Sequence, residues 1–409
     1  MTKTIGAIAA VFFCAAIAWL ILGGTIESRT NSQDRELRAK VGQLWGTPLS
    51  QAAPSASLDI PRVVETQEQG PDGRTIVKHA TVVDHFPVPV TRSDIRLDLH
   101  LDQRKKGLLW YSTYRADFTG SFDIECLSDK PAGELVVTFN FPSQNGQYDD
   151  FRFDFDGHAV PVVRGSGNSV STVIKNPVPG SKHTLQLRYV SQGLDTYTYN
   201  FSEGIAEARD FSLVATTDFD GYDFPGNTMS PTEKQRVGNG WQLTWKYKSL
   251  VTGQGIGLAM PQKLNPGPLA ARISLFAPVS LGFFFFLTFV LSILRNLRVH
   301  PMNYFFLAAA FFAFHLLLAY LVDHISIHLA FAVCSLTSIF LVVSYLRIIV
   351  GSRFAFIEFA LAQLVYLVGF SYAFFFEGFT GLTVTVGAIV TLFLVMQLTA
   401  RIDWAEKFK

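Results

Sequence analysis

The chain has 409 residues, enough for two or more folding units, and 49% of them are hydrophobic while only 16% are charged. The middle of the chain has the composition of a soluble protein, whereas the last third is nearly free of acids and bases. A formal net charge of +1 argues against a nucleic-acid partner, because binding a polyphosphate requires a concentrated basic face.

Six long apolar runs are predicted to cross a lipid bilayer. The first, residues 4–26, carries no charge and is long enough for a hydrocarbon core of roughly 30 Å. Its length, and the lack of a small-residue cleavage site before Glu27, favour an uncleaved signal anchor in residues 1–26 over a cleaved signal peptide. The other five runs lie in a predicted membrane domain, residues 266–409, which ends in a short cytoplasmic tail. They cover residues 273–294, 302–322, 325–346, 354–376 and 379–400, and no broken helix is evident among them.

The positions of lysine and arginine predict the orientation of these spans. Cytoplasmic loops carry an excess of these residues, and six spans place all of the flanking ones on one side. Both termini are therefore expected in the cytoplasm, and the middle of the chain outside it. The residues concerned are Lys3, Arg295, Arg298, Arg347, Arg353, Arg401, Lys407 and Lys409.

Residues 27–46 are predicted to form a juxtamembrane amphipathic helix that continues from the anchor. Leu37, Val41 and Leu44 recur at helical spacing with basic residues between them. Such a helix can rest on the lipid headgroups or on the domain that follows, and the sequence leaves both open.

Residues 47–265 are predicted to form a large extracytoplasmic β-rich domain. Apolar residues alternate with polar ones in many short runs, for example at Ile95, Leu97 and Leu99, which is typical of antiparallel sheets with one buried face. Asp156-Gly157 lies between two such runs and predicts a tight hairpin turn. The expected fold class is therefore a membrane α-helical protein of six helices, one plus five, with a sandwich-like antiparallel β domain of one or two subdomains.

Polar residues in the membrane block are the candidate functional residues. Asp323, His324 and His328 cluster where the third span ends and the fourth begins, and antiparallel packing places Glu377 on the same side. His324 and His328 are four residues apart and are expected on one helix face. Such a cluster could form a metal site or a proton-handling site. The favoured interpretation is that these residues are hydrated at the membrane interface and cap the helix ends.

Two further ionisable groups lie within the apolar runs. His315, near the middle of its span, is expected to be a neutral side chain hydrogen-bonded across helices, with a proton path as the alternative. Glu358 lies about one turn from Arg353 and is expected to pair with it or to extend toward the interface.

The sequence carries no recognisable catalytic motif and indicates no cofactor. It lacks a P-loop, a G-x-S-x-G elbow and an H-E-x-x-H metalloprotease motif. The basic turn Arg104-Lys105-Lys106-Gly107 is interpreted as a solvated hairpin tip, and a contact with an anionic envelope polymer is the alternative.

Several short segments of the chain are informative when they are taken together. They are His300-Pro301-Met302 with Tyr304, Ile402-Asp403-Trp404, Lys106-Gly107 through Tyr111, Tyr114 and Arg115 to Gly120-Ser121-Phe122-Asp123, and Phe224-Pro225-Gly226 with Gly240-Trp241. In their order along the chain these segments resemble the CreD-type inner-membrane proteins, also called cell envelope integrity proteins. The similarity extends over most of the chain from about Asp94 onward. An Asp323-His324 pair stands where the family usually has Glu-His, and Ala405 stands where it usually has an aromatic residue.

The resemblance implies a bacterial inner-membrane protein tied to envelope integrity and stress responses, and it implies no reaction. The first functional hypothesis is a non-enzymatic protein whose periplasmic β domain binds an envelope protein or polymer. The second is a transporter or channel for a small solute, lipid or proton that uses the polar groups of the helices. The third is a membrane-embedded enzyme acting on lipid or cell-wall precursors, with Asp323 and His324 as acid and base. Apart from the bilayer, no partner can be named from the sequence.

Overall fold

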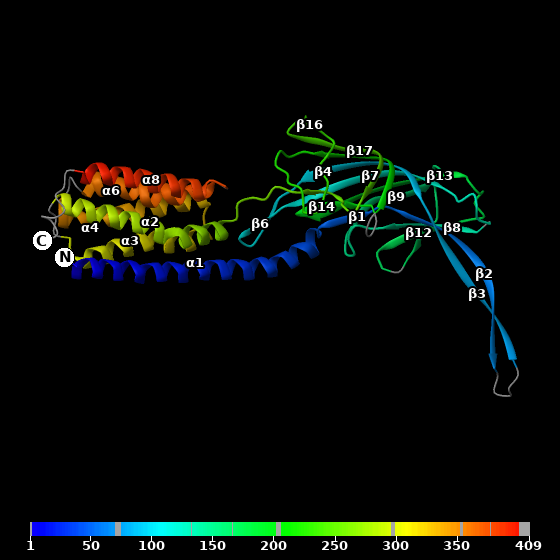
Figure 1. Cartoon of the computed structure of the whole chain (residues 1–409), viewed down its shortest axis with the longest axis horizontal. Helices are drawn as coiled ribbons and strands as arrows, with labels where there is room; N and C mark the ends of the chain where they lie inside the picture. Colours follow the sequence, from blue (N-terminus) through cyan, green and yellow to red (C-terminus); the bar gives the residue numbers. More distant parts are fainter. Residues whose placement is uncertain are drawn as a thin grey trace. The chain divides into compact units, whose positions relative to one another are not determined.

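The computed structural model describes residues 2–69, 75–131, 133–165, 167–201, 206–295, 299–351, 355–376 and 378–400. It divides into two compact units (Figure 1). The helical unit comprises Met1–Glu36 together with Leu264–Lys409, and the β unit comprises Leu37–Lys263. Each unit has an extensive apolar core of its own.

The helical unit consists of long apolar helices joined by short connections. Six helices within the described residues are long and apolar enough to cross a membrane, which confirms the six predicted spans. In lipid every backbone N–H and C=O must be satisfied within the segment, so such apolar runs fold as helices. The regular helices are α1 (Thr2–Trp45), α2 (Pro266–Leu294), α3 (Pro301–Leu321), α4 (Ile327–Val350) and α8 (Thr380–Thr399).

The fifth span departs from a regular α-helix, contrary to the expectation of an unbroken one. It alternates between π-helical, α-helical and 3₁₀ segments, and π-helical turns are rare and frequently occur at functional sites. No proline marks these changes of winding, and the charged residue Glu358 lies in the first π-helical segment only, so hydropathy does not indicate where the winding changes. The segments are η1 (Ala355–Phe359, π), α6 (Ala360–Gln363), η2 (Leu364–Gly369, π), α7 (Phe370–Tyr372) and η3 (Ala373–Phe375, 3₁₀).

Residues 27–46 are not a separate element but the continuation of α1. The helix is unbroken to Trp45, and the division between the two units falls after Glu36. Its last turns pack on the β unit, where Val41 is fully buried. Leu37–Trp45 therefore pack within the β unit, while contact of residues 27–36 with lipid headgroups stays a prediction. The cluster comprises Leu37, Val41, Trp45, Leu109, Tyr111 and Leu194.

Within the described residues, the strands of the β unit form sheets of eight, five, three and two strands. Their orders are β10-β9-β13-β7-β4-β15-β17-β16, β11-β12-β8-β2-β3, β1-β14-β18 and β5-β6. The strands are β1 (Leu49–Ala52), β2 (Ser55–Gln69), β3 (Thr75–Val88), β4 (Val90–Leu101), β5 (Arg104–Lys106), β6 (Leu109–Tyr111), β7 (Thr113–Glu125), β8 (Glu134–Asn140), β9 (Tyr148–Phe155), β10 (His158–Ala159), β11 (Val163–Arg164), β12 (Ser169–Lys175), β13 (Lys182–Leu194), β14 (Thr196–Asn200), β15 (Ala206–Thr217), β16 (Glu233–Val237), β17 (Gly240–Thr252) and β18 (Ile256–Ala259).

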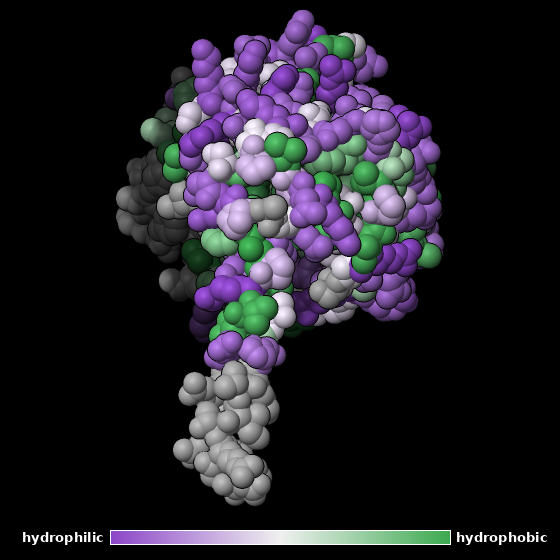
Figure 2. All heavy atoms as spheres, turned by 90° about the vertical axis from the view of Figure 1, so that its right-hand side faces the viewer, coloured by the Kyte–Doolittle hydropathy of each residue, from purple (hydrophilic) through white to green (hydrophobic). Residues whose placement is uncertain are grey.

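Alternating side chains place one face of the eight-stranded sheet in the core. On β4, Ile95, Leu97 and Leu99 are buried while Arg96 and Asp98 are exposed. Because successive strand residues point to opposite faces, the predicted pattern of one buried and one wet face is confirmed here. Figure 2 shows a β-unit surface on which polar residues predominate and apolar patches are smaller.

The predicted hairpin turn is confirmed, and most strand pairs among the described residues are antiparallel as predicted, but two pairs are parallel. Asp156 and Gly157, with φ of 50° and 77°, join β9 to β10 in the left-handed conformation of a tight turn. However, β15 pairs in parallel with β4, and β1 with β14. Parallel neighbours need long connections, so these pairs form between distant segments that local alternation cannot identify. The sandwich-like arrangement stays a prediction.

The side chain of Gln51 on β1 joins three sheets. It is fully buried, and its Oε1 accepts a hydrogen bond from the Tyr189 hydroxyl of β13 at 2.7 Å. Its Nε2 donates to the carbonyl oxygen of Asn140, the last residue of β8, at 3.0 Å. A buried amide that is hydrogen-bonded in this way fixes how the three sheets pack, because any other arrangement of the sheets would leave its polar atoms without partners.

Candidate functional site

The predicted polar cluster between the third and fourth spans is only partly assembled. Asp323 and His324 lie in the turn after α3, whereas His328 lies in the first turn of α4. The two histidines therefore do not share a helix face, because the turn interrupts the periodicity that the prediction assumed. Glu377, the fourth predicted member, lies outside the described residues.

Asp323 binds an arginine of the first helix. Arg29 of α1 approaches the Asp323 carboxylate at 3.3 Å, and it also donates to the carbonyl oxygen of Ala319 at 3.2 Å. The guanidinium lies 5.8 Å from the centroid of the Tyr320 ring. Ala319 is in the last turn of α3, where a positive charge is favourable because helix carbonyls carry partial negative charge there. The Asp323 side chain therefore ties α1 to the end of α3.

The two histidines of the cluster have different surroundings. Both are exposed, but the ring of His328 also packs against Phe375 with centroids 5.2 Å apart. Among the residues that the structure describes, no group of three His, Cys, Asp or Glu side chains is arranged to hold a metal ion.

His315 is buried as predicted, but its hydrogen bond runs within its own helix. Its Nδ1 donates to the carbonyl oxygen of Phe311 at 2.9 Å, one turn earlier on α3. The expected bond across helices is not found among the described residues, and the ring of Trp19 of α1 lies nearly perpendicular to the imidazole with centroids 5.5 Å apart. The Nε2 atom of His315 and the Nε1 atom of Trp19 are both buried without a hydrogen-bond partner in the described structure.

Glu358 pairs with a residue of another helix. Its carboxylate accepts a bond from Arg295, at the end of α2, at 3.0 Å. The expected partner, Arg353, lies outside the described residues. The ion pair joins the start of the fifth span to the end of α2.

A polar chain missed by the sequence analysis crosses the interior of the helical unit. Gln363, fully buried at the junction of α6 and η2, donates to the Ser338 hydroxyl of α4 at 2.7 Å. Ser338 in turn donates to the carbonyl oxygen of Ala310 in α3 at 2.7 Å. The Oε1 atom of Gln363 has no partner in the described structure. A lone glutamine inside an apolar run was the signal that could have revealed this chain.

The second π-helical segment takes part in another set of polar contacts. The Ser280 hydroxyl of α2 donates to the carbonyl oxygen of Tyr366, and the Tyr366 hydroxyl lies 2.8 Å from Thr391 Oγ1 of α8. Both π-helical neighbourhoods thus carry polar contacts to other helices. Unusual winding and buried polar groups coincide in this span.

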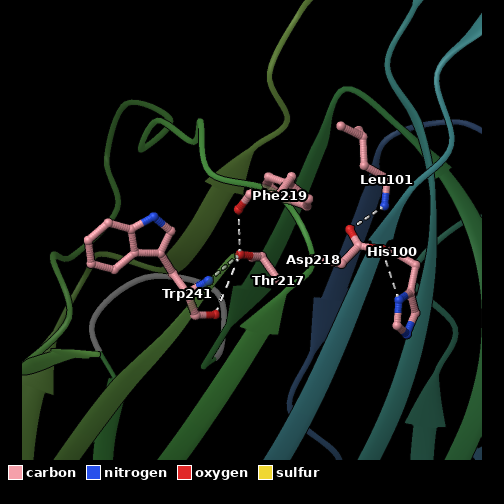
Figure 3. A network of polar contacts seen from close by, with 6 residues as sticks. All are labelled: His100, Leu101, Thr217, Asp218, Phe219 and Trp241. Atoms are coloured by element: carbon pink, nitrogen blue, oxygen red, sulfur yellow. Dashed lines mark hydrogen bonds and ion pairs between the residues drawn. The ribbon is translucent and has the colours of Figure 1, made fainter. Parts of the chain in front are cut away.

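On the β unit, a polar network holds three strands together at one end of the eight-stranded sheet (Figure 3). Asp218 accepts from the Leu101 N–H at 2.9 Å and from His100 Nδ1 at 3.2 Å. Thr217 accepts from the Trp241 N–H at 3.0 Å and donates to the carbonyl oxygen of Phe219, also at 3.0 Å. Both carboxylate oxygens of Asp218 serve to fasten β4 to β15, so this His–Asp pair supports the sheet.

The basic turn at Arg104 is a hairpin tip, as predicted, but its cations are not simply solvated. Arg104 and Lys106 lie 5.3 Å and 5.9 Å from the centroid of the Trp45 ring. These cation–π contacts fasten the β5–β6 hairpin to the end of α1.

A two-stranded ribbon, here called the β2–β3 arm (residues 60–69 and 75–84), extends from the five-stranded sheet (Figure 1). Strand β2 pairs with β8 only from Ser55 to Asp59, and no described strand pairs with the arm beyond that point. Val82 on one face, and Val63 and Val83 on the other, are 43%, 64% and 42% exposed. The arm therefore presents apolar side chains and unpaired backbone groups together.

A comparison with protein families matches residues 223–405 to the family described as inner membrane protein CreD. This confirms the resemblance over that range, and the earlier segments from Asp94 lie outside it. No curated protein matches the chain.

Solved structures that are similar to part of the chain include an M1 zinc metallopeptidase mutant from Deinococcus radiodurans, at 14% identity and a TM-score of 0.25. The same mutant bound to a Tyr-Ser-Ala substrate gives 14% and 0.26. In both cases 42% of this chain and 42% of the other are covered, so the chain spans well under half of those proteins. Similarity this low carries no argument about fold or activity.

Proposed function

We propose that this chain, whose residues 223–405 match the family described as inner membrane protein CreD, supports cell-envelope integrity, without enzymatic activity, by binding an envelope protein through its β unit. The six apolar helices and the family support a multi-pass membrane protein. The proposal includes cytoplasmic termini and a periplasmic β unit, which the distribution of lysine and arginine supports.

The β2–β3 arm is the observation that carries this proposal. A two-stranded ribbon alone is marginally stable in water, and exposed strand edges are templates for pairing with another chain. Natural sheets usually protect such edges, whereas this arm combines open edges with exposed valines on both faces. A partner segment that adds a strand to the arm would satisfy the backbone groups and cover the valines.

The test compares arm variants with a matched surface variant in cells that lack their own copy of the protein. Val82→Lys and Val83→Lys place charges on the arm, while Val251→Lys changes a valine that is 67% exposed on β17. The arm variants should lose most of the protection against detergent and β-lactam, and the Val251 variant should keep it. A photo-crosslinker at residue 82 should capture an envelope protein. Full protection by both arm variants at normal expression would refute the proposal.

A second candidate function, transport of a small polar solute or proton, is favoured by one observation. The buried Gln363 with its unpartnered Oε1 lies beside a π-helical segment, and polar groups at such positions usually line substrate pathways. Substituting Gln363→Leu with the arm intact distinguishes the two functions. Loss of protection in a stably folded Gln363→Leu variant supports transport, and full protection supports binding through the arm.

A further inference from the structure

We infer that a concavity on the wet face of the eight-stranded sheet binds an anionic saccharide. Its volume is about 660 Å³, within the range of small-molecule sites, and it lies where β4, β15 and β17 are neighbours. It is distinct from the β2–β3 arm, so the inference does not rest on the proposed function. The polar lining residues are Arg92, Asp94, Asp210, Ser212, Lys246 and Lys248.

The strand register arranges the polar lining in rows. Ser212 on β15 is paired with Asp94 of β4 on one side and with Lys246 of β17 on the other. Adjacent strands are about 4.8 Å apart, so the carboxylate and the ammonium flank the hydroxyl across roughly 10 Å. This spacing presents an acceptor, a hydroxyl and a cation to a ligand of one or two sugar rings.

The charges of the concavity are incompletely paired within the protein. Arg92 lies 3.9 Å from Asp94, at the outer limit of an ion pair. Lys246, Lys248 and Asp210 make no ion pair or side-chain hydrogen bond in the part of the chain that the structure describes. Two ammonium groups and one carboxylate are therefore available to a ligand.

This combination determines the ligand class. The lysines favour an anionic group, and a carboxylate acceptor such as Asp210 favours a hydroxyl donor close to that group. A bare polyphosphate would be repelled by Asp94 and Asp210, and a neutral sugar would leave both lysines unused. Uronate-type sugars carry both features, namely a carboxylate and several hydroxyls.

The backbone at Asp210 supports a role for its side chain. Asp210 has φ of 39°, in the left-handed region, and the regular pairing of β15 with β17 is interrupted between Arg209 and Phe211. Glycine adopts this conformation without strain, so an aspartate here carries a conformational cost. Strained residues of this kind concentrate at ligand sites, where the side chain or the altered backbone serves binding.

The binding test uses the full chain in nanodiscs and calorimetric titration with trigalacturonate. Maltotriose, inorganic phosphate and a tetra-aspartate peptide are the comparison ligands. Trigalacturonate should bind at least tenfold more tightly than each of these. Equal binding of maltotriose, phosphate or the peptide would overturn the assignment, as would the absence of trigalacturonate binding.

Variants then locate the site. Lys246→Gln combined with Lys248→Gln should weaken trigalacturonate binding at least tenfold, and Asp210→Asn about fivefold. Arg209→Gln is the matched control, because Arg209 precedes Asp210 on β15 but pairs with Glu207 at 2.8 Å. Unchanged affinity in the lysine variant, or an equal loss in the control, would contradict the site.

A substitution that removes strain separates binding from folding. Asp210→Gly should raise the melting temperature while it weakens trigalacturonate binding. Retained affinity in this variant would show that the Asp210 side chain takes no part. The arm variants Val82→Lys and Val83→Lys should bind trigalacturonate normally, so failure of the arm proposal and failure of this one are distinguishable.

Discussion

Removing the ion pair between Arg29 and Asp323 is expected to destabilise the helical unit. Arg29 makes two polar contacts with the end of α3, one to the Asp323 carboxylate at 3.3 Å and one to the Ala319 carbonyl oxygen at 3.2 Å. The side chains are 35% and 21% exposed, respectively, so the pair is partly shielded from water. Its contribution should therefore exceed that of a fully exposed pair.

The magnitude follows from these contacts. At the observed 3.3 Å, and with an effective dielectric constant of about 20, the Coulomb attraction is about 5 kcal/mol before desolvation. Desolvation and side-chain ordering reduce the net contribution of an exposed ion pair to stability to about 0.2–1 kcal/mol, and the contribution of this pair should lie above that range. The charge at the end of α3 adds about 0.3–1 kcal/mol. We expect Arg29→Met to cost about 2 kcal/mol and Asp323→Asn about 1 kcal/mol, because only the first also removes the bond to Ala319.

The assay is reversible unfolding of the full chain in mixed micelles, followed by tryptophan fluorescence. Arg35→Gln is the control, since Arg35 is an exposed arginine of α1 two turns beyond Arg29. Exchanging the charges, Arg29→Asp with Asp323→Arg, should restore only part of the stability, because an aspartate at position 29 cannot donate to the Ala319 carbonyl. A larger cost for Asp323→Asn than for Arg29→Met, or single variants as stable as the control, would refute the reasoning.

Three further predictions concern the buried polar groups. Tyr189→Phe leaves Gln51 Oε1 without its donor and should lower the unfolding free energy of the β unit by about 1–3 kcal/mol, measured by thermal circular dichroism. Burial raises the pKa of four tyrosines of the β unit above the usual 10.0, so their stabilising contribution is complete below about pH 10 and is lost as the pH rises further. These tyrosines are Tyr114, Tyr189, Tyr197 and Tyr199. The melting temperature of the protein, measured between pH 8 and 11.5, should therefore fall at the alkaline end of the range. A melting temperature that rises with pH would contradict the raised tyrosine pKa values. Gln363→Leu removes an unpartnered buried oxygen, so the helical unit should be as stable as the parent or more stable, and a loss above about 1 kcal/mol would show that the amide is satisfied in the membrane.

The elements that depend on local patterning were predictable from the sequence. Long apolar runs with almost no charge predicted the spans, and strict alternation around Ile95 predicted strands with one buried face. The Asp156-Gly157 turn was predictable because its conformation depends on two adjacent residues. The parallel pairing of β4 with β15 was not predictable. About a hundred residues separate the two strands, and the sequence of each strand does not identify the strand that it pairs with.

The candidate site was predicted less well, because the role of a polar residue depends on its hydrogen-bond and ion-pair partners, which the sequence does not identify. Asp323 was identified as a residue of interest, but its partner Arg29 lies almost three hundred residues earlier, on a helix assigned to anchoring. His315 was correctly placed in the interior, whereas its hydrogen bond to Phe311 lies within its own helix and was expected across helices. Gln363 carries no charge and so escaped a search for ionisable groups.

The buried polar atoms of the helical unit bear on the second candidate function, transport. Four buried polar atoms there have no partner in the described structure, and each such group costs about 1–3 kcal/mol relative to an apolar side chain that fills the same space. An anchor would be more stable with leucine or phenylalanine at those positions. Stability therefore does not account for these residues, and the coincidence of Gln363 with π-helical winding makes the fifth span the first place to look for movement or passage of a polar species. The residues are Trp19, Ser274, His315 and Gln363.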